Sequence, residues 1–268
     1  MSGFGPGTGV VCDLDGVLYR GEQPVPGSVE AVQRLRASGA ALLFCTNNSY
    51  PTIATYKRKL AGMGIVVGPH ELLTSAIVTA DALRARDMDG ARALVLGGEG
   101  LRESLQARGI EPNGARSDAG VDLVVVGYDP SFDYNSMRRA CNALLAGAPF
   151  FATNDDVTFP APGGVLWPGT GAILASLVAA SGRAPEVMGK PHAPMMDAAA
   201  DRLRGAREVL IVGDRPDTDL AGGRVKGWTT VLVLSGVTDR SDVASVEPRP
   251  DLVVDDLSGL VAELERRG

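Results

Sequence analysis

Short apolar runs alternate with amphipathic segments along most of the chain. The runs near the two ends are almost continuously apolar, as is typical of strands that are covered on both faces of a sheet. They are VVCDLDG (10–16), ALLFCTNN (41–48), EVLIVGD (208–214), TTVLVLSG (229–236) and DLVVDDL (251–257). Between the first two runs, Val29, Val32 and Leu35 recur at helical spacing. This alternation predicts an α/β fold built on a parallel sheet.

The middle of the chain has strands and helices of its own. Its strands are expected in ALVLGG (93–98), DLVVVGY (122–128) and PFFATN (149–154). Helices are expected near residues 52–62, 75–86, 101–108, 135–146 and 170–181. We therefore expect a second α/β domain at residues 77–185, inserted into a first domain made of residues 1–76 and 186–268.

Polar side chains lie at the ends of three of the five strands that are expected near the two ends of the chain. Asp13 and Asp15 end the first, Thr46 and Asn47 end the second, and Asp214 ends the run EVLIVGD. Because side chains alternate along a strand, Asp13 and Asp15 are expected to point to the same face. Ligands of open α/β sheets bind beyond the carboxyl ends of the strands. The sequence therefore predicts a site at this edge.

Composition and charge exclude several classes of protein. The chain has 268 residues and a formal net charge of −6, so it lacks the basic footprint of a nucleic-acid-binding protein. No apolar run is long enough to span a bilayer, and the first residues do not resemble a signal peptide. The three cysteines show no metal-ligand spacing and are expected to be reduced. We expect a cytoplasmic protein that binds neither membrane nor nucleic acid.

The charges at the predicted edge need a counterion. Two carboxylates about 4 Å apart repel by roughly 4 kcal/mol at an effective dielectric constant of about 20. Mg²⁺ relieves such repulsion and commonly combines one or two carboxylates with phosphate oxygens and water. Lys190 lies between Gly189 and Pro191, at a constrained turn before an expected helix. A fixed ammonium and Mg²⁺ together would let an anionic substrate approach a carboxylate, which indicates a phosphate ester.

Four short motifs carry a resemblance to a known family. DLDGVLY (13–19), CTNNS (45–49), GKP (189–191) and GDRPDTD (213–219) occur in the order of the four motifs of the haloacid dehalogenase-like (HAD) phosphohydrolases, which they resemble. ATNDDVTFP (152–160) and PGTGA (168–172) resemble, more narrowly, the NagD-like subfamily of p-nitrophenyl phosphatases and phosphoglycolate phosphatases. The resemblance extends from about Val10 to Leu260 and implies a Rossmann-like parallel-sheet core with an inserted cap.

The resemblance implies a Mg²⁺-dependent phosphatase that acts through a covalent intermediate. Asp13 would attack phosphorus to form an aspartyl-phosphate, and Asp15 would protonate the leaving group and then activate water. The metal would be held by Asp13, by the backbone carbonyl of Asp15 and by Asp214. Asp219 would lie next to these ligands and support them. The phosphate would contact Gly16, Thr46, Asn47, Asn48 and Lys190.

The spacing of the motifs indicates where the cap lies. About thirty residues separate Asp15 from Thr46, which is enough for one helical crossover. About 140 residues separate Thr46 from Lys190, which is far more than a crossover needs. In the family, an insertion at this place is the C2-type α/β cap. Asn154 and Asp156 would shape the mouth between cap and core, and the cap is expected to support a homodimer.

The expected function is hydrolysis of a small phosphorylated metabolite. Two alternatives stay open, a phosphotransferase that uses the same intermediate and a non-catalytic phosphometabolite-binding protein. The family's phosphonate hydrolases use a cap lysine, and residues 77–185 contain none. Where the family often has proline, this chain has Asp155. His192 is expected to be either an exposed residue or a residue at a helix start.

Overall fold

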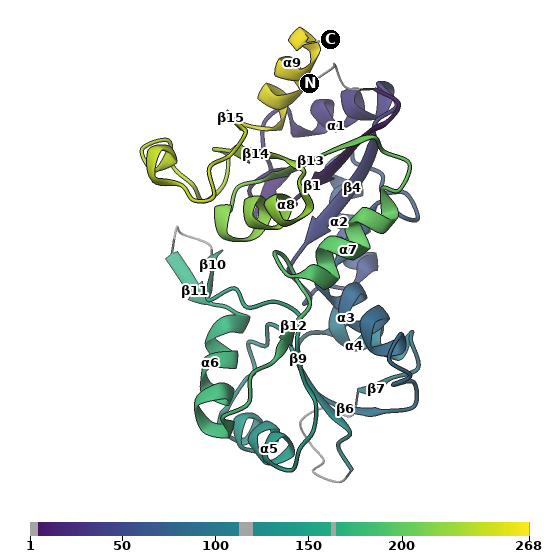
Figure 1. Cartoon of the computed structure of the whole chain (residues 1–268), viewed down its shortest axis with the longest axis vertical. Helices are drawn as coiled ribbons and strands as arrows, with labels where there is room; N and C mark the ends of the chain where they lie inside the picture. The colour runs from purple at the N-terminus through teal and green to yellow at the C-terminus, as the bar shows by residue number, and fades with distance from the viewer. Residues whose placement is uncertain (1–4, 113–119, 162–164, 268) are drawn as a thin grey trace. The chain divides into compact units, whose positions relative to one another are not determined.

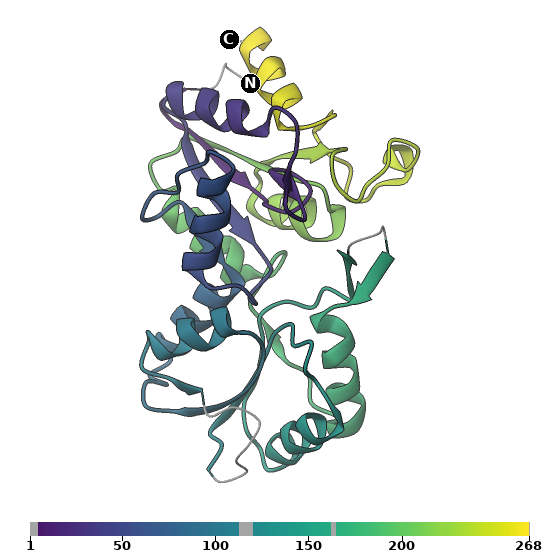
Figure 2. The same cartoon turned by 180° about the vertical axis from the view of Figure 1, so that it is seen from behind.

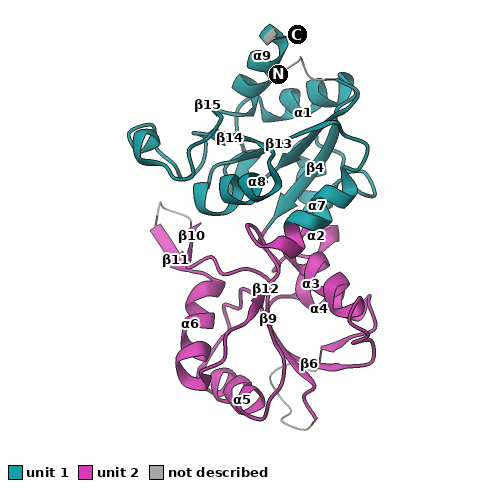
Figure 3. Ribbon diagram, in the orientation of Figure 1, with its two compact units in different colours: residues 1–46, 56–73, 196–268 teal, residues 47–55, 74–195 magenta. Residues whose placement is uncertain are grey.

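The computed structural model describes residues 5–112, 120–161 and 165–267. The chain divides into two compact units, which Figure 3 shows in different colours. Residues 1–46, 56–73 and 196–268 form the first unit, and residues 47–55 and 74–195 form the second. The second unit thus includes the segment 77–185 that the sequence predicts as an insertion, together with short flanking stretches and the segment 47–55.

The first unit is built on one sheet (Figure 1). Within the described residues, six strands form it in the order β15-β14-β13-β1-β4-β5, and the pairings from β15 to β4 are parallel. Their bounds are β1 Thr8–Cys12, β4 Ala41–Thr46, β5 Leu72–Thr74, β13 Glu208–Gly213, β14 Thr229–Val233 and β15 Leu252–Val254. All five residues of β1 are buried, as expected for a strand covered on both faces.

Helices lie on both faces of this sheet, as Figures 1 and 2 show from opposite sides. α1 (Ser28–Ala37) packs against α9 (Leu257–Arg267), and Arg34 pairs with Glu265 between them. α8 (Ala221–Lys226) lies on the other face. The remaining elements of this part of the chain are β2 Tyr19–Arg20, β3 Gln23–Pro24, α2 Ile53–Gly62, α7 Ala193–Arg202, η2 Pro216–Leu220 and η3 Val243–Ser245. These helices thus cover the two faces of the sheet.

The second unit has a parallel sheet of its own. In the part of the chain that the structure describes, its strand order is β12-β9-β8-β6-β7. The strands are β6 Arg92–Leu96, β7 Glu111–Pro112, β8 Leu123–Val126, β9 Phe150–Ala152 and β12 Glu186–Val187. Leu94 and Val124 face a core shared with α5 (Tyr134–Leu145) and α6 (Thr170–Ser181). Val95 and Val125 have the opposite parity and are also fully buried, so both faces are covered.

The other helices of the second unit are α3 (Ser75–Arg84) and α4 (Glu99–Gln106), which pack against each other. An antiparallel hairpin joins β10 (Thr158–Ala161) to β11 (Val165–Pro168). Among the described residues the longest helices are α5 and α6, with 12 residues each. None of the helices in the described ranges is long and apolar enough to cross a membrane.

The α/β fold predicted from the apolar pattern is confirmed. The helix expected at 170–181 is found with those bounds, and the others agree within a few residues. The sheet strands β5, β7 and β12 were not predicted, because two or three residues are too few to show a periodicity. The run VVCDLDG ends as a strand at Cys12, so its two aspartates lie just beyond the strand.

Candidate active site

Two aspartates leave neighbouring strands of the first unit side by side. Asp13 follows β1 and Asp214 follows β13, and the parallel register pairs Cys12 with Val212 directly before them. The backbone N–H of Asp13 continues the ladder by donating to Val212 O at 2.9 Å. Thr46, which ends β4 on the other side of β1, is 3% exposed. Sequence reasoning placed these three residues at one edge for the same reason.

Asp219 joins Asp13 and Asp214 in a compact carboxylate cluster. One carboxylate oxygen from each of the three lies within 4.8 Å of the others. All three residues are buried, with 9%, 3% and 1% of Asp13, Asp214 and Asp219 exposed. Gly213 permits this approach, because a Cβ there would lie 2.1 Å from the carboxyl carbon of Asp219. The turn of η2 therefore brings a third acid to the edge.

The chemistry of this cluster fits a divalent cation. Three buried carboxylates repel one another strongly, since their charges are poorly screened away from water. Hard cations such as Mg²⁺ and Ca²⁺ prefer oxygen ligands of this kind. The remaining acid, Asp15, is exposed and its carboxylate is not part of the cluster. The two acids of the first motif therefore have different surroundings, as separate roles require.

Tyr19 holds the turn that carries Asp15 and Gly16. Its backbone O accepts from Gly16 N at 2.8 Å, and its hydroxyl donates to Asp15 Oδ2 at 3.4 Å. Burial, with the charges of Asp15, Tyr56 and Asp13, raises the pKa of Tyr19 well above its ordinary value, so the phenol keeps its proton.

Gly16 lies in the left-handed region with φ +81°, and a Cβ there would lie 2.3 Å from Asp214 Oδ2. Both the backbone conformation and the close approach thus require glycine at this position.

A loop that the sequence did not single out supports the cluster. Val237 N donates to Asp214 Oδ2 at 2.8 Å, and Thr238 Oγ1 donates to Asp214 O at 2.6 Å. Ser235 Oγ donates to Gly16 O at 2.6 Å. A Cβ on Gly236 would lie 1.9 Å from Asp214 Oδ2. The segment 235–238 therefore fixes the orientation of Asp214 and the turn after β1. Its only sequence signal is that polar residues follow a buried strand.

In the second unit, Asn47 links several of the predicted residues. Its side-chain Oδ1 accepts from Lys190 N at 2.7 Å, and its Nδ2 donates to Lys190 O at 3.0 Å and to Asp156 Oδ2 at 3.3 Å. Its backbone O accepts from Asn154 Nδ2 at 2.8 Å and from Ser75 Oγ at 2.5 Å. The carboxamide of Asn47 thus connects the GKP and TNDD motifs.

Lys190 and its neighbours are closely packed. Lys190 is 2% exposed, and a Cβ on Gly189 would lie 2.5 Å from Thr153 O and 2.6 Å from Asn47 Oδ1. Asn48 is exposed, and its Oδ1 accepts from Tyr50 N at 3.0 Å. The side chain of Asn48 therefore stabilises a turn.

The contact between Asp155 and His192 was not foreseen. Asp155 Oδ2 lies 3.0 Å from His192 Nε2, and both side chains are partly exposed. His192 directly precedes α7, as expected. The pair joins the TNDD loop to the loop of Lys190. The one sign of this contact in the sequence is Asp155 itself, because the family often has proline at its position.

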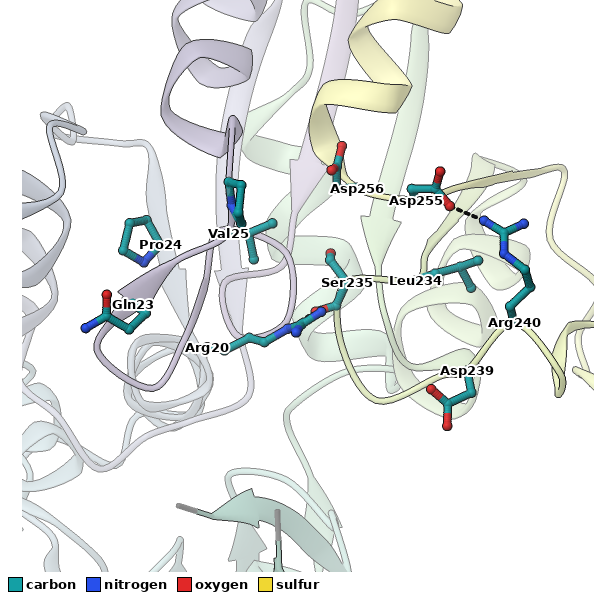
Figure 4. A pocket seen from close by; sticks show the side chains of 11 residues that line it. Arg20, Gln23, Pro24, Val25, Leu234, Ser235, Asp239, Arg240, Asp255 and Asp256 are labelled. Carbon is teal, nitrogen blue, oxygen red and sulfur yellow. Dashed lines mark hydrogen bonds and ion pairs between the residues drawn. The ribbon is translucent and has the colours of Figure 1, made fainter. Parts of the chain in front are cut away.

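A pocket of about 540 Å³ lies elsewhere in the first unit, and Figure 4 shows it from close by. Its lining includes none of the predicted site residues. The guanidinium of Arg20 points to Ser235 and donates to its backbone O, and Arg240 pairs with Asp255. The two arginines in this view thus have partners beside them, and the predicted site residues at the strand ends lie outside the pocket lining.

Comparison with known proteins identifies the family. Residues 10–111 match the family model described as haloacid dehalogenase-like hydrolase, and residues 187–260 match the related HAD-hydrolase-like model. An acid sugar phosphatase of Staphylococcus haemolyticus is 35% identical over 259 residues, which cover 96% of this chain and 97% of that protein. A dihydroxyacetone phosphatase of Corynebacterium glutamicum is 34% identical over 249 residues, which cover 92% of this chain and 88% of that protein.

Solved structures agree over nearly the whole chain. A p-nitrophenyl phosphatase from Archaeoglobus fulgidus has a TM-score of 0.87 and 35% identity, covering 96% of this chain and 99% of that one. NagD from Escherichia coli has a TM-score of 0.82 and 32% identity, covering 95% and 98%. A glycerol phosphate phosphatase from Mycobacterium tuberculosis, in complex with magnesium, has a TM-score of 0.85 and 34% identity, covering 94% and 75%.

The fold, the clustered strand-end acids and these matches define a hydrolase of the α/β class. The chain belongs to the haloacid dehalogenase-like hydrolases, in their NagD-like branch. It is a phosphoric monoester hydrolase of small phosphorylated metabolites, as the sequence predicted.

Proposed function

We propose that this protein is a Mg²⁺-dependent phosphatase that hydrolyses a small sugar or triose phosphate through an aspartyl-phosphate on Asp13. The observation that carries the proposal is the buried cluster of Asp13, Asp214 and Asp219 at the strand ends. These carboxylates and the backbone carbonyl of Asp15 would hold Mg²⁺, which neutralises charge on the phosphoryl group and on the nucleophile.

In the first half of the reaction, a carboxylate oxygen of Asp13 attacks phosphorus. A P–O bond to Asp13 forms while the P–O bond to the leaving alcohol breaks. Asp15 gives its proton to the departing oxygen, so the product leaves as a neutral alcohol. The exposed position of Asp15 supports this role, because the acid must reach the substrate.

In the second half, Asp15 is ionised and accepts a proton from water. The hydroxide equivalent attacks the phosphorus of the aspartyl-phosphate, the bond between phosphorus and the Asp13 oxygen breaks, and inorganic phosphate is released. Asp13 regains its carboxylate and Asp15 its proton. The sum is hydrolysis of one phosphate ester by one water.

Residues of the second and third motifs are proposed to supply further phosphate contacts. Lys190, held through its backbone by the side chain of Asn47, would balance the negative charge of the phosphoryl group. The backbone of Asn47 and of Asn48 and the hydroxyl of Thr46 would bind phosphate oxygens, with Gly16 leaving room. Asn154 and Asp156, bonded to Asn47, would shape the entrance.

We assign residues 1–76 and 186–268 to the catalytic core and residues 77–185 to a cap that selects the substrate. The names of the relatives support sugar and triose phosphates as the substrate class. A homodimer through the cap is proposed because Val165, Leu166 and Trp167 of β11 are 51%, 65% and 50% exposed, and sedimentation velocity tests it. Buried Cys12, Cys45 and Cys141 support a cytoplasmic location.

The experiment is phosphate release from dihydroxyacetone phosphate, glycerol phosphate and p-nitrophenyl phosphate, with and without Mg²⁺. We expect turnover that requires Mg²⁺ and falls about 10³-fold or more in Asp13→Asn, which keeps the shape of the side chain but is a poor nucleophile. Wild-type rates in Asp13→Asn, or rates unaffected by chelation, would show that the proposal is wrong.

A further inference from the structure

Tyr19 belongs to the first motif, yet no step of the proposed reaction uses it. It is 1% exposed, although it lies only four residues after the exposed Asp15. Its hydroxyl donates to Asp15 Oδ2 at 3.4 Å. A buried phenol normally finds a polar partner, and here that partner is the carboxyl assigned as acid and base.

The ring of Tyr19 is held from its face as well. Lys59 Nζ, from α2, lies 3.8 Å from the ring centroid, and the same ammonium lies 3.4 Å from Glu22 Oε1. A cation is attracted to the negative face of an aromatic ring. Together with the backbone bond from Gly16 N to Tyr19 O, these contacts restrict where the ring and its hydroxyl can lie.

We infer that Tyr19 is a positioning residue that orients the carboxyl of Asp15, so that Oδ1 transfers the proton to and from the reacting groups. The inference rests on the proposed function, because it takes Asp15 to be the acid and base. Its basis is geometric. The Tyr19 hydroxyl donates to Oδ2, so Oδ2 acts as an acceptor and the transferable proton of Asp15 belongs on Oδ1.

This role has a consequence that a purely structural role does not share. Alkoxide leaving groups are strongly basic and need a well-placed proton, whereas p-nitrophenolate leaves readily without one. If the Asp15 carboxyl is less well oriented, the hydrolysis of alkyl phosphates should therefore slow more than that of p-nitrophenyl phosphate. The same folded protein and the same metal site hydrolyse both substrates. Damage to the fold or to the metal site would therefore lower the two rates alike.

The test compares kcat/KM for glycerol phosphate and p-nitrophenyl phosphate in wild type and Tyr19→Phe. The value of kcat/KM reports the steps up to release of the alcohol. For Tyr19→Phe we expect a loss of about tenfold with glycerol phosphate, a fraction of the 10²–10⁴ that a positioned acid contributes. With p-nitrophenyl phosphate we expect a loss of no more than about twofold. Thermal unfolding of the variant checks that the near-isosteric change leaves the fold intact.

A second pair of variants probes the face of the ring. Lys59→Met removes the ammonium but keeps the aliphatic stem. It should also lower kcat/KM more with glycerol phosphate than with p-nitrophenyl phosphate, by a smaller factor than Tyr19→Phe. Lys57→Met, exposed on the same helix, should match wild type. Equal losses on both substrates, or none, in Tyr19→Phe would overturn the inference.

The variant Asp15→Asn shows whether a negative result for Tyr19→Phe refutes the role of Tyr19 alone or also the role of Asp15 in the proposed reaction. If Asp15→Asn shows a strong leaving-group preference and Tyr19→Phe does not, the proposed function stands and Tyr19 has no positioning role. If Asp15→Asn shows none, Asp15 is not the acid, and the acid–base step of the proposed reaction is wrong together with the role of Tyr19.

Discussion

At the scale of single residues, the site depends on small side chains that let charged groups approach one another. Gly16, Gly213 and Gly236 each border a carboxylate of the cluster so closely that a Cβ would overlap it. The protein interior is packed too densely to absorb such an overlap without moving its neighbours. These glycines therefore determine the geometry of the carboxylates as much as the acids themselves do.

Gly16→Ala tests this dependence, with Gly21→Ala as its control. Both glycines have positive φ, +81° and +55°, but only Gly16 borders Asp214, and Gly21 has nothing within 4 Å. We expect Gly16→Ala to lower kcat/KM about 10²-fold and to raise the Mg²⁺ concentration needed for half-maximal activity, because Asp214 must move. Gly21→Ala carries backbone strain alone and should keep its activity. Equal effects of the two changes would contradict this account.

At the scale of elements, hydrogen bonds between neighbouring strands support the edge of the first sheet. Asp251, before β15, accepts from Thr230 N at 2.8 Å and from Thr230 Oγ1 at 2.9 Å, and lies 2.9 Å from the guanidinium of Arg224. Burial alone would raise the pKa of Asp251, but these bonds and the Arg224 charge outweigh it, and the pKa is lowered from its ordinary 3.8.

The lowered pKa predicts a loss of stability in acid. Because the folded state holds the ionised form, the contribution of Asp251 is fully present above the unfolded pKa near 3.8 and is lost as the pH falls through the folded value. Urea unfolding of wild type and Asp251→Asn at several pH values measures it. We expect the wild type to be more stable near neutral pH and the difference to shrink below about pH 4. A difference that stays constant down to pH 2 would refute the prediction.

The motif residues could be predicted from the sequence because a local rule places them. Asp13, Thr46 and Asp214 each follow an apolar strand, and parallel strands end at one edge. The roles of Ser235 and His192 could not be found in this way. Ser235 meets Gly16 across 219 positions and His192 meets Asp155 across 37, and no local pattern encodes either contact.

At the scale of the whole molecule, the chain carries its carboxylate cluster in one compact unit and the contacts of Lys190 and Asn47 in the other. Each unit has its own sheet and its own core. A ligand that binds one unit in its folded form stabilises that unit by mass action. Metal binding should therefore be visible in thermal unfolding without any substrate.

Mg²⁺ at about 100 times its Kd should stabilise the folded protein by about 2.7 kcal/mol and raise Tm by several degrees. Asp219→Asn should lose most of this rise, because it removes one of the three buried carboxylates. Asp217→Asn changes an exposed carboxyl of the same turn and should keep it. Differential scanning calorimetry with added Mg²⁺ or EDTA makes the comparison. An unchanged rise in Asp219→Asn would exclude it from the metal site.

The covalent role of Asp13 is tested most directly by rapid acid quenching of the enzyme during turnover of p-nitrophenyl phosphate with Mg²⁺, followed by peptide mass mapping. The account predicts one phosphoryl group on Asp13 in the wild type and none in Asp13→Asn. A wild-type protein that turns over substrate and never carries phosphate on Asp13 would contradict it.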